Sequence, residues 1–347
     1  MPGSRRPPGE RSWPTFGLAG VAAWGLVNER AITLVALGAL LLAGVLVINL
    51  PALGAWWYAR RFGLSAAALP AAQRLVAGDR VLVVAPHPDD EVLCCAGMVL
   101  QAHEAGAQVW IVYVTAGDAF ELDAILLERK VWTSGEPMLE LGRRRLDEAR
   151  TAAAMLGVAH DHVVVLGFPD RGLRALVDGD PKKLFRSRFT LRSSVPYEAA
   201  QSPGLAYTGE NLRAELRRVL AAVNPTVVLA PIPRDAHPDH RAVGELMIEL
   251  LGERRQLDIG RWWIVHGDRE WPLPKGVHLR QPLFPPLRAR NVAWERFDLE
   301  PQWVETKLRA IYAYRSQVDL MRRFLEAFAR RNELVSRSPA ENQYRAP

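Results

Sequence analysis

The chain has 347 residues, of which 49% are hydrophobic, so it can bury a substantial core and exceeds the length of one average domain. Its formal net charge of +6 is spread along the sequence without a known nucleic-acid module, which argues against a nucleic-acid partner. The two cysteines, Cys94 and Cys95, are adjacent in a helical pattern and point in different directions, which excludes a disulfide scaffold.

The N-terminal part predicts a membrane anchor at residues 31–59. This stretch carries no charged residue, and its first twenty positions are almost wholly apolar. Twenty helical residues cover about 30 Å, the thickness of a bilayer's hydrocarbon core. Trp56 to Tyr58 then precede Arg60 and Arg61, the order expected of an aromatic belt followed by head-group contacts. A cleaved signal peptide is the competing interpretation, although its apolar core is usually shorter.

The flanking segments leave the orientation of this single-pass anchor open. Residues 1–30 form a tail whose apolar stretch, 16–27, is too short for a second span and is expected at the interface or in a hairpin. Residues 60–79 are a linker. Arginines stand on both sides of the span, so the positive-inside rule nearly cancels, while the lack of a disulfide framework favours a cytoplasmic catalytic domain.

Alternating strand and helix patterns predict an α/β domain at residues 80–335. We expect a Rossmann-like, mainly parallel sheet with helices on both faces, followed by a flexible tail at 336–347. The expected strands are 81–85, 109–115, 162–166, 226–230 and 262–266. The expected helices are 91–105, 137–156, 209–223 and 239–251, with two more between 302 and 334.

A first polar motif, His87-Pro88-Asp89-Asp90-Glu91, directly follows the strand 81–85 and precedes a helical pattern. The acidic turn therefore lies at a strand's carboxyl end, where open α/β sheets gather their ligands. Asp89 and Asp90 alone are also explained as caps of the following helix, because Asp is a common N-cap residue.

A second motif, His237-Pro238-Asp239-His240, repeats this context after the strand 226–230. Catalytic zinc usually takes three protein ligands from His, Asp or Glu and keeps a further position for water or substrate. The two motifs together supply such a set, and they predict a metallohydrolase. The remaining histidines, including His266, are interpreted as structural or surface residues.

Two later segments carry alternative interpretations. Residues 178–208 form a polar stretch with several basic residues, which we interpret as a rim or lid over the metal site, because long connections are usually functional or disordered. The last helix has an apolar stripe with arginines interspersed. Packing against the domain explains it most simply, and contact with a membrane surface is the alternative. The stripe comprises Leu320, Met321, Phe324, Leu325 and Phe328.

The two motifs resemble the signatures of the PIG-L/LmbE-like zinc-dependent N-deacetylases, and the resemblance extends from about residue 80 to about residue 318. Three further patterns agree in their order along the chain, at residues 142–158, 166–170 and 307–317. The chain departs from the family at Tyr314, where relatives often carry a His.

The resemblance implies a role for each matching residue. The zinc ligands would be His87, Asp90 and His240. Asp89 would be the general base that takes a proton from the attacking water, and His237 would steady the oxyanion or protonate the leaving amine. From the residues themselves, Asp239 is the expected carboxylate that orients His237, or a plain helix cap. Arg145 would contact substrate hydroxyls, unless it belongs to a solvated basic helix face.

The sequence therefore predicts a membrane-anchored, zinc-dependent hydrolase that removes the N-acetyl group from an N-acetylglucosamine-type sugar, either lipid-linked or a soluble glycoside. The alternatives are a metal-dependent hydrolase of another amide or an ester, and a non-catalytic sugar-binding module. A His/His/Asp set also accepts other divalent ions such as Fe²⁺. The expected partners are an N-acetylated sugar or glycolipid and membrane lipid around the N-terminal helix.

Overall fold

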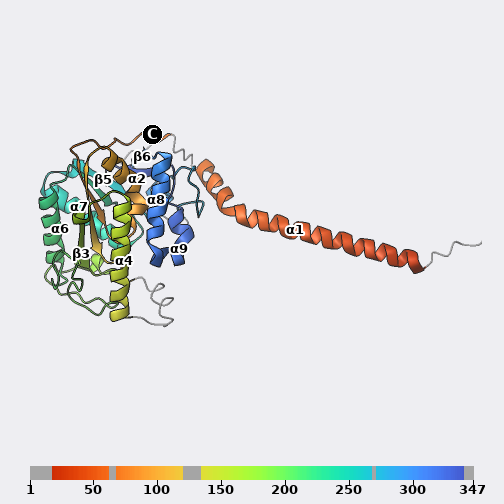
Figure 1. Cartoon of the computed structure of the whole chain (residues 1–347), viewed down its shortest axis with the longest axis horizontal. Coiled ribbons are helices and arrows are strands. Elements are labelled where there is room, and N and C mark those ends of the chain that lie inside the picture. Colours follow the sequence, from red (N-terminus) through yellow and green to blue (C-terminus); the bar gives the residue numbers. More distant parts are fainter. Residues whose placement is uncertain (1–17, 62–67, 120–133, 268–270, 340–347) are drawn as a thin grey trace, which may run out of the picture. The chain divides into compact units, whose positions relative to one another are not determined.

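The computed structural model describes residues 18–61, 68–119, 134–267 and 271–339 (Figure 1). Parts of three predicted segments lie outside the described residues: 1–17 of the N-terminal tail, 62–67 of the linker and 340–347 of the C-terminal tail. The chain divides into two compact units, Met1–Leu53 and Gly54–Pro347.

Helix α1 (Leu18–Arg61) contains the predicted anchor at residues 31–59. Large apolar side chains along it are exposed, for example Val35 at 72% and Leu46 at 49%. The side chains at 48, 49, 51, 52, 55, 58 and 59 lie outside the described residues. Within what the structure describes, no helix combines the length and the apolarity needed to cross a bilayer. The transmembrane anchor is therefore not confirmed.

The described part of the second unit is built on one seven-stranded sheet of order β3-β2-β1-β4-β5-β7-β6. Its five parallel strands are β1 (Arg80–Ala85), β2 (Gln108–Thr115), β3 (Val163–Phe168), β4 (Val227–Pro231) and β5 (Gly260–Trp263). The first four are rich in Val, Leu and Ile, as expected for strands that are buried on both faces, whereas β5 reads Gly-Arg-Trp-Trp. The predicted mainly parallel sheet is confirmed, and strand bounds differ from prediction by a few residues.

The far edge of the sheet is antiparallel, which the sequence did not predict. β7 (Asn332–Ser336) pairs antiparallel with β5 and with β6 (Trp294–Asp298). The prediction of helix up to residue 334 was wrong, because residues from Asn332 onward form β7. The polar residues of this strand are buried and hydrogen-bonded to specific partners, which local sequence does not reveal. The Asn332 side chain exchanges hydrogen bonds with the backbone of Leu283, at 2.8 and 3.1 Å.

Two groups of helices flank the sheet (Figure 1). One consists of α2 (Asp90–Glu104), α4 (Glu136–Met155) and α8 (Pro301–Ala313), which continues into α9 (Arg315–Glu326). The other consists of α5 (Leu173–Asp178), α6 (Gly209–Val223) and α7 (Pro238–Glu253). Short 3-10 turns occur at His160–His162, Leu257–Ile259 and Leu287–Ala289.

A buried ion pair joins α2 to the C-terminal elements. Lys307 Nζ lies 2.7 Å from Glu333 Oε1, and both side chains are at most 1% exposed. Lys307 also donates to the Leu93 carbonyl at 2.9 Å, while Glu333 accepts the backbone N–H groups of Gly97 and Met98. Helix α2 is thus held from α8 and β7 at the same time.

Lys307→Met is expected to lower the free energy of unfolding by about 3–5 kcal/mol, because it leaves the buried Glu333 carboxylate without its counter-charge. Urea denaturation measures the loss. The matched control is Arg337→Ala, which removes an exposed pair with Glu295 and should cost about 0–1 kcal/mol. Equal stability of the two variants would contradict the importance of the buried pair.

Candidate metal site

The sheet topology brings the two polar motifs together. β1 and β4 are neighbours, and the order of strands changes direction between them, so the loops that follow both strands open at the same crevice. His87, Asp89 and Asp90 follow β1, whereas His237 and the first residues of α7 follow β4. Residues 150 positions apart in sequence therefore share one site.

The three predicted ligands converge on one point. His87 Nδ1 lies 3.2 Å from His240 Nε2 and 3.5 Å from Asp90 Oδ2, and His240 Nε2 lies 3.3 Å from Asp90 Oδ1. Zinc bonds of about 2.0–2.2 Å set tetrahedral ligand atoms roughly 3.3–3.6 Å apart. The three side chains are buried, at 7%, 1% and 0% exposure for His87, Asp90 and His240. This donor set fits a single divalent ion.

Each of the two ligand imidazoles, those of His87 and His240, contacts a carboxylate through its other ring nitrogen, the one that does not face the ligands. His240 Nδ1 contacts Asp235 Oδ2 at 3.1 Å, and His87 Nε2 contacts Asp170 Oδ1 at 3.2 Å. Asp235 also accepts the backbone N–H groups of Val265 and His266. Burial alone would raise the pKa of Asp235, but His240 holds it below its usual range. Carboxylate–His–metal chains of this kind fix the tautomer that binds metal.

Asp235 and Asp170 were not among the predicted site residues. A usable signal was present, because a ligand His in these sites regularly needs a carboxylate partner, and Asp235 stands two residues before the second motif. Asp170 belongs to one of the patterns that carried the family resemblance, but its sequence position did not indicate which imidazole it would reach.

Asp235→Asn should weaken metal binding about 10- to 100-fold, because the amide cannot hold the His240 imidazole as a carboxylate does. Competition with a chromophoric chelator measures the change. Asp161→Asn, at an exposed position, is the control and should leave the affinity unaltered. A metal affinity within threefold of the wild type would argue against this role for Asp235.

Asp239 makes contacts other than the predicted one. Its carboxylate accepts the Arg171 N–H at 2.6 Å and lies 3.4 Å from His87 Nε2. The contact that the structure gives between Asp239 and His237 runs through the backbone, because the Asp239 N–H donates to His237 Nδ1 at 3.3 Å. The predicted orienting carboxylate is thus replaced by a backbone donor, since the turn into α7 points the Asp239 side chain toward His87.

The hydrogen bond from the Asp239 N–H to His237 Nδ1 also determines the tautomer of His237. An Nδ1 atom that accepts a hydrogen bond leaves the ring proton on Nε2. Burial and the neighbouring imidazoles of His87 and His240 lower the pKa of His237 to about 2, so the ring is neutral at physiological pH. His237 is therefore a hydrogen-bond donor through Nε2 at the edge of the cavity.

Asp89 stands beside the ligands and lines the same cavity. It occupies the N-cap position of α2, yet its side chain caps no backbone N–H among the described residues, so the capping interpretation is wrong for Asp89. Burial and the adjacent Asp90 carboxylate raise the pKa of Asp89 well above its usual range. A buried carboxylate of this kind is a better proton acceptor than an exposed one.

Arg145 is 5% exposed and lies at the site, so the alternative of a solvated basic face is wrong. Its guanidinium donates to the carbonyls of Gly117 and Pro88 at 2.7 and 2.9 Å, and Nη2 lies 4.0 Å from Asp89 Oδ2. Arg145 lines the cavity and at the same time supports the backbone of the first motif. Contact with substrate hydroxyls stays a prediction.

The cavity at the site has a volume of about 170 Å³. Besides its polar and charged residues, it is lined by the apolar side chains of Leu93, Ala119, Val265, Met321 and Phe324. Of the apolar stripe predicted for the last helix, Leu325 and Phe328 belong to the hydrophobic core, while Met321 and Phe324 pack against it and line the cavity. His266, interpreted from sequence as structural or surface, also lines it, with its ring 4.9 Å from that of His240 and stacked on Phe324.

The segment 178–208 packs beside this region. Phe189 joins Ala119, Met138 and Leu141 in a small apolar cluster, and the Tyr197 hydroxyl donates to Asp118. The described residues that line the cavity include none from this segment, so the interpretation as a lid receives no support.

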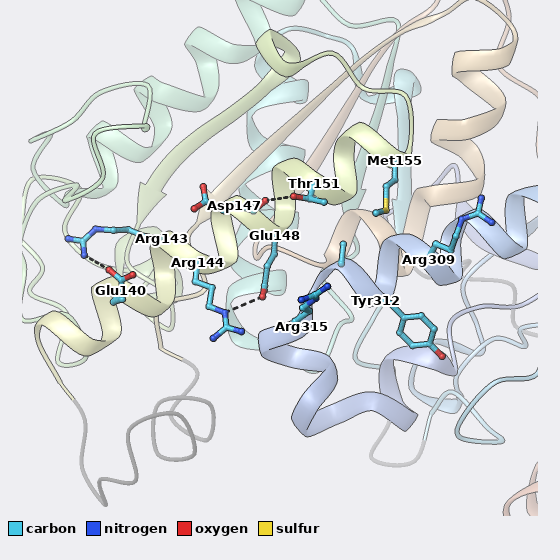
Figure 2. A pocket seen from close by; sticks show the side chains of 11 residues that line it. Glu140, Arg143, Arg144, Asp147, Glu148, Thr151, Met155, Arg309, Tyr312 and Arg315 are labelled. Atoms are coloured by element: carbon cyan, nitrogen blue, oxygen red, sulfur yellow. Dashed lines mark hydrogen bonds and ion pairs between the residues drawn. The ribbon is translucent and has the colours of Figure 1, made fainter.

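A larger groove of about 810 Å³ lies between α4 and the α8–α9 corner (Figure 2). Its charges are mostly paired with one another, since Arg143 contacts Glu140 at 2.9 Å and Arg144 contacts Glu148 at 3.4 Å (Figure 2). Two of the candidate metal ligands, His87 and Asp90, line the smaller cavity. The smaller cavity is therefore the candidate active site.

A converging His/Asp/His set with a buried carboxylate beside it is typical of metal-dependent hydrolases. Residues 82–251 match the family model described as PIG-L: GlcNAc-PI de-N-acetylase, and this part of the chain is a PIG-L family domain. The resemblance inferred from the sequence motifs is thereby confirmed.

Curated relatives are similar to this chain over part of their length. Diacetylchitobiose deacetylase of Thermococcus kodakarensis is 30% identical over 175 residues, which cover 50% of this chain and 49% of that protein. A 1D-myo-inositol 2-acetamido-2-deoxy-alpha-D-glucopyranoside deacetylase of Nakamurella multipartita is 31% identical over 179 residues, covering 50% and 54%. N,N'-diacetylchitobiose deacetylase from Pyrococcus horikoshii has a TM-score of 0.41 and 23% identity, covering 72% of this chain and 76% of that chain. The chain spans about half the length of the curated relatives it matches.

Proposed function

We propose that this protein is a metal-dependent N-deacetylase that removes the acetyl group from an N-acetylglucosamine-type sugar. The observation that carries the proposal is the position of the buried Asp89 carboxylate next to the converging ligands His87, Asp90 and His240. The relatives support the substrate class, because their names specify diacetylchitobiose and an N-acetylated glucosaminyl inositol.

The proposed ligands are His87, Asp90 and His240, and zinc is the proposed ion, with Fe²⁺ as an alternative. When bound, such an ion polarises the amide carbonyl and makes a water molecule more acidic. The Asp89 carboxylate accepts a proton from the attacking water, and His237 Nε2–H donates to the oxygen that becomes negative. Asp89 then returns the proton to the leaving nitrogen, so amide and water yield acetate and a free amine.

The two alternative functions, sugar binding without catalysis and hydrolysis of another bond, would give different products. A sugar-binding module needs no base, so the buried Asp89 next to a full ligand set favours catalysis over mere binding. Hydrolysis of an ester would release an acid without a new amine. Product analysis therefore separates the three functions.

A lipid-linked substrate is part of the proposal, and so is association of α1 with a membrane. The support for the latter is the run of exposed large apolar side chains along α1, which includes Leu34, Val35, Leu41 and Val47. Such a surface gains free energy by leaving water. Flotation of the full-length protein with liposomes tests the association, and a protein that stays in the soluble fraction without detergent would refute it. We propose that the catalytic unit lies on the cytoplasmic side of the membrane. Protease protection in intact cells tests this orientation.

The function is tested by metal analysis of the gently purified full-length chain, followed by assays of acetate and new amine. The panel contains N-acetylglucosamine, diacetylchitobiose, an N-acetylglucosaminyl inositol and an N-acetylglucosamine-bearing glycolipid. The expected result is equimolar acetate and amine from at least one of them. Absence of acetate from every substrate, with the metal bound, would reject the proposal.

A further inference from the structure

The backbone of Asp89 has an unusual conformation. Its φ of 119° and ψ of −27° lie in the positive-φ region, which residues with a side chain rarely adopt. Such a conformation persists only where the surroundings enforce it. Because Asp89 is the proposed base and Asp90 the proposed ligand, this turn decides where both carboxylates point.

A buried carboxylate holds the turn at Asp89. Glu91 Oε2 accepts the backbone N–H of Asp89 at 3.2 Å, and Glu91 Oε1 accepts the hydroxyl of Tyr314. The Tyr314 hydroxyl also lies 3.5 Å from that of Tyr113. The Glu91, Tyr314 and Tyr113 side chains are fully buried, each at 0% exposure. These contacts are therefore shielded from bulk water.

The same C-terminal segment supports the residue before Asp89. Gln317 Nε2 donates to the Pro88 carbonyl at 3.1 Å, and Arg145 Nη2 donates to the same oxygen at 2.9 Å. Ser316, between Tyr314 and Gln317, is fixed by two hydrogen bonds to Glu148. The junction of α8 and α9 thus contacts the first motif at two points, one on each side of the Asp89 N–H.

We propose that Tyr314 and Glu91 are positioning residues that hold the Asp89 backbone in its positive-φ conformation and so aim the Asp89 carboxylate at the reacting centre. This inference rests on the proposed function for its kinetic consequences, but the hydrogen-bonded arrangement itself does not. Tyr314 acts through Glu91 and lies outside the set of residues that line the cavity in the described structure.

Tyr314→Phe tests the proposal, because it removes the hydroxyl and keeps the ring. The expected results are a fall in kcat of about 10- to 100-fold, a KM within twofold of the wild type and an unchanged metal content. Independently of any substrate, hydrogen–deuterium exchange should become faster in the peptide that contains the Asp89 N–H. Thermal unfolding establishes that the variant is folded.

The matched control is Tyr312→Phe. Tyr312 lies two residues earlier on the same segment, and its hydroxyl likewise donates to a glutamate, Glu326, at 2.6 Å. This variant should lose a hydrogen bond of the same kind, from a half-buried tyrosine hydroxyl to a glutamate. Its kcat and the exchange rate at Asp89 should stay at wild-type values.

Three outcomes separate the explanations. A Tyr314→Phe protein with kcat within twofold of the wild type and unchanged exchange at Asp89 overturns the proposal. Loss of kcat in proportion to loss of metal overturns it as well, since that indicates a general disturbance of the site. If the wild type deacetylates none of the sugars, the proposed function fails, and the exchange measurement still decides whether Tyr314 holds the turn.

Discussion

Asp89→Ala is expected to lower kcat by about 10²–10⁴-fold while the protein keeps its metal. The reason is that Asp89 is the buried carboxylate beside the ligands and, in the proposed mechanism, does not itself coordinate the ion. Burial raises the pKa of Asp89, which strengthens it as a proton acceptor, and alanine removes that acceptor without touching His87, Asp90 or His240. Acetate release under substrate saturation measures the loss.

The control for this experiment is Asp161→Ala, at an exposed position before β3. It should leave both turnover and metal content unaltered. Wild-type-like turnover in Asp89→Ala would reject Asp89 as the base. Loss of the metal in Asp89→Ala would instead make Asp89 a ligand, and the assignment of the carboxylates in the first motif would have to be revised.

His240→Ala is expected to abolish both metal binding and turnover. It removes one of three ligands and leaves the buried Asp235 carboxylate without its imidazole partner, at 0% exposure. An ion bound only to the native state stabilises it in proportion to the logarithm of its concentration over Kd. The wild type should therefore melt at a lower temperature in the presence of a chelator, whereas the variant should show no such shift.

Metal content by atomic emission and thermal unfolding with and without chelator test this prediction. His160→Ala, an exposed histidine on a 3-10 turn, is the matched control and should behave as the wild type. A His240→Ala protein that retains a full equivalent of metal would show that the ion is held elsewhere, for example by His87 together with Asp170 and Asp239.

The sequence predicted the central sheet well because its signal is local. Runs such as Val81 to Ala85 are apolar throughout, as parallel strands buried on both faces must be. The antiparallel edge gave no such signal. β6 reads Trp-Glu-Arg-Phe-Asp, which is neither continuously apolar nor strictly alternating. β7 includes Asn332 and Glu333, whose burial depends on partners far away in the chain. Tertiary contacts override local preference there.

The metal site shows the same difference between residues with a local sequence signal and residues that depend on distant contacts. His87, Asp90 and His240 were predictable, because their donor chemistry and their position after two strands are readable from short motifs. Asp170 and Asp235 required knowledge of which imidazole each carboxylate reaches. Asp239 was assigned to His237 from sequence adjacency, but the direction of a side chain at the start of a helix is set by the turn and not by adjacency.

The contacts from Tyr314, Gln317 and the Lys307–Glu333 pair have a consequence for the size of an active fragment. All three proposed ligands lie within 82–251, the part matched by the family model. Tyr314, Gln317, Lys307 and Glu333, which support the first motif and α2, all lie beyond residue 300. A recombinant fragment that stops at residue 251 would carry every proposed metal ligand and still lack these supporting contacts.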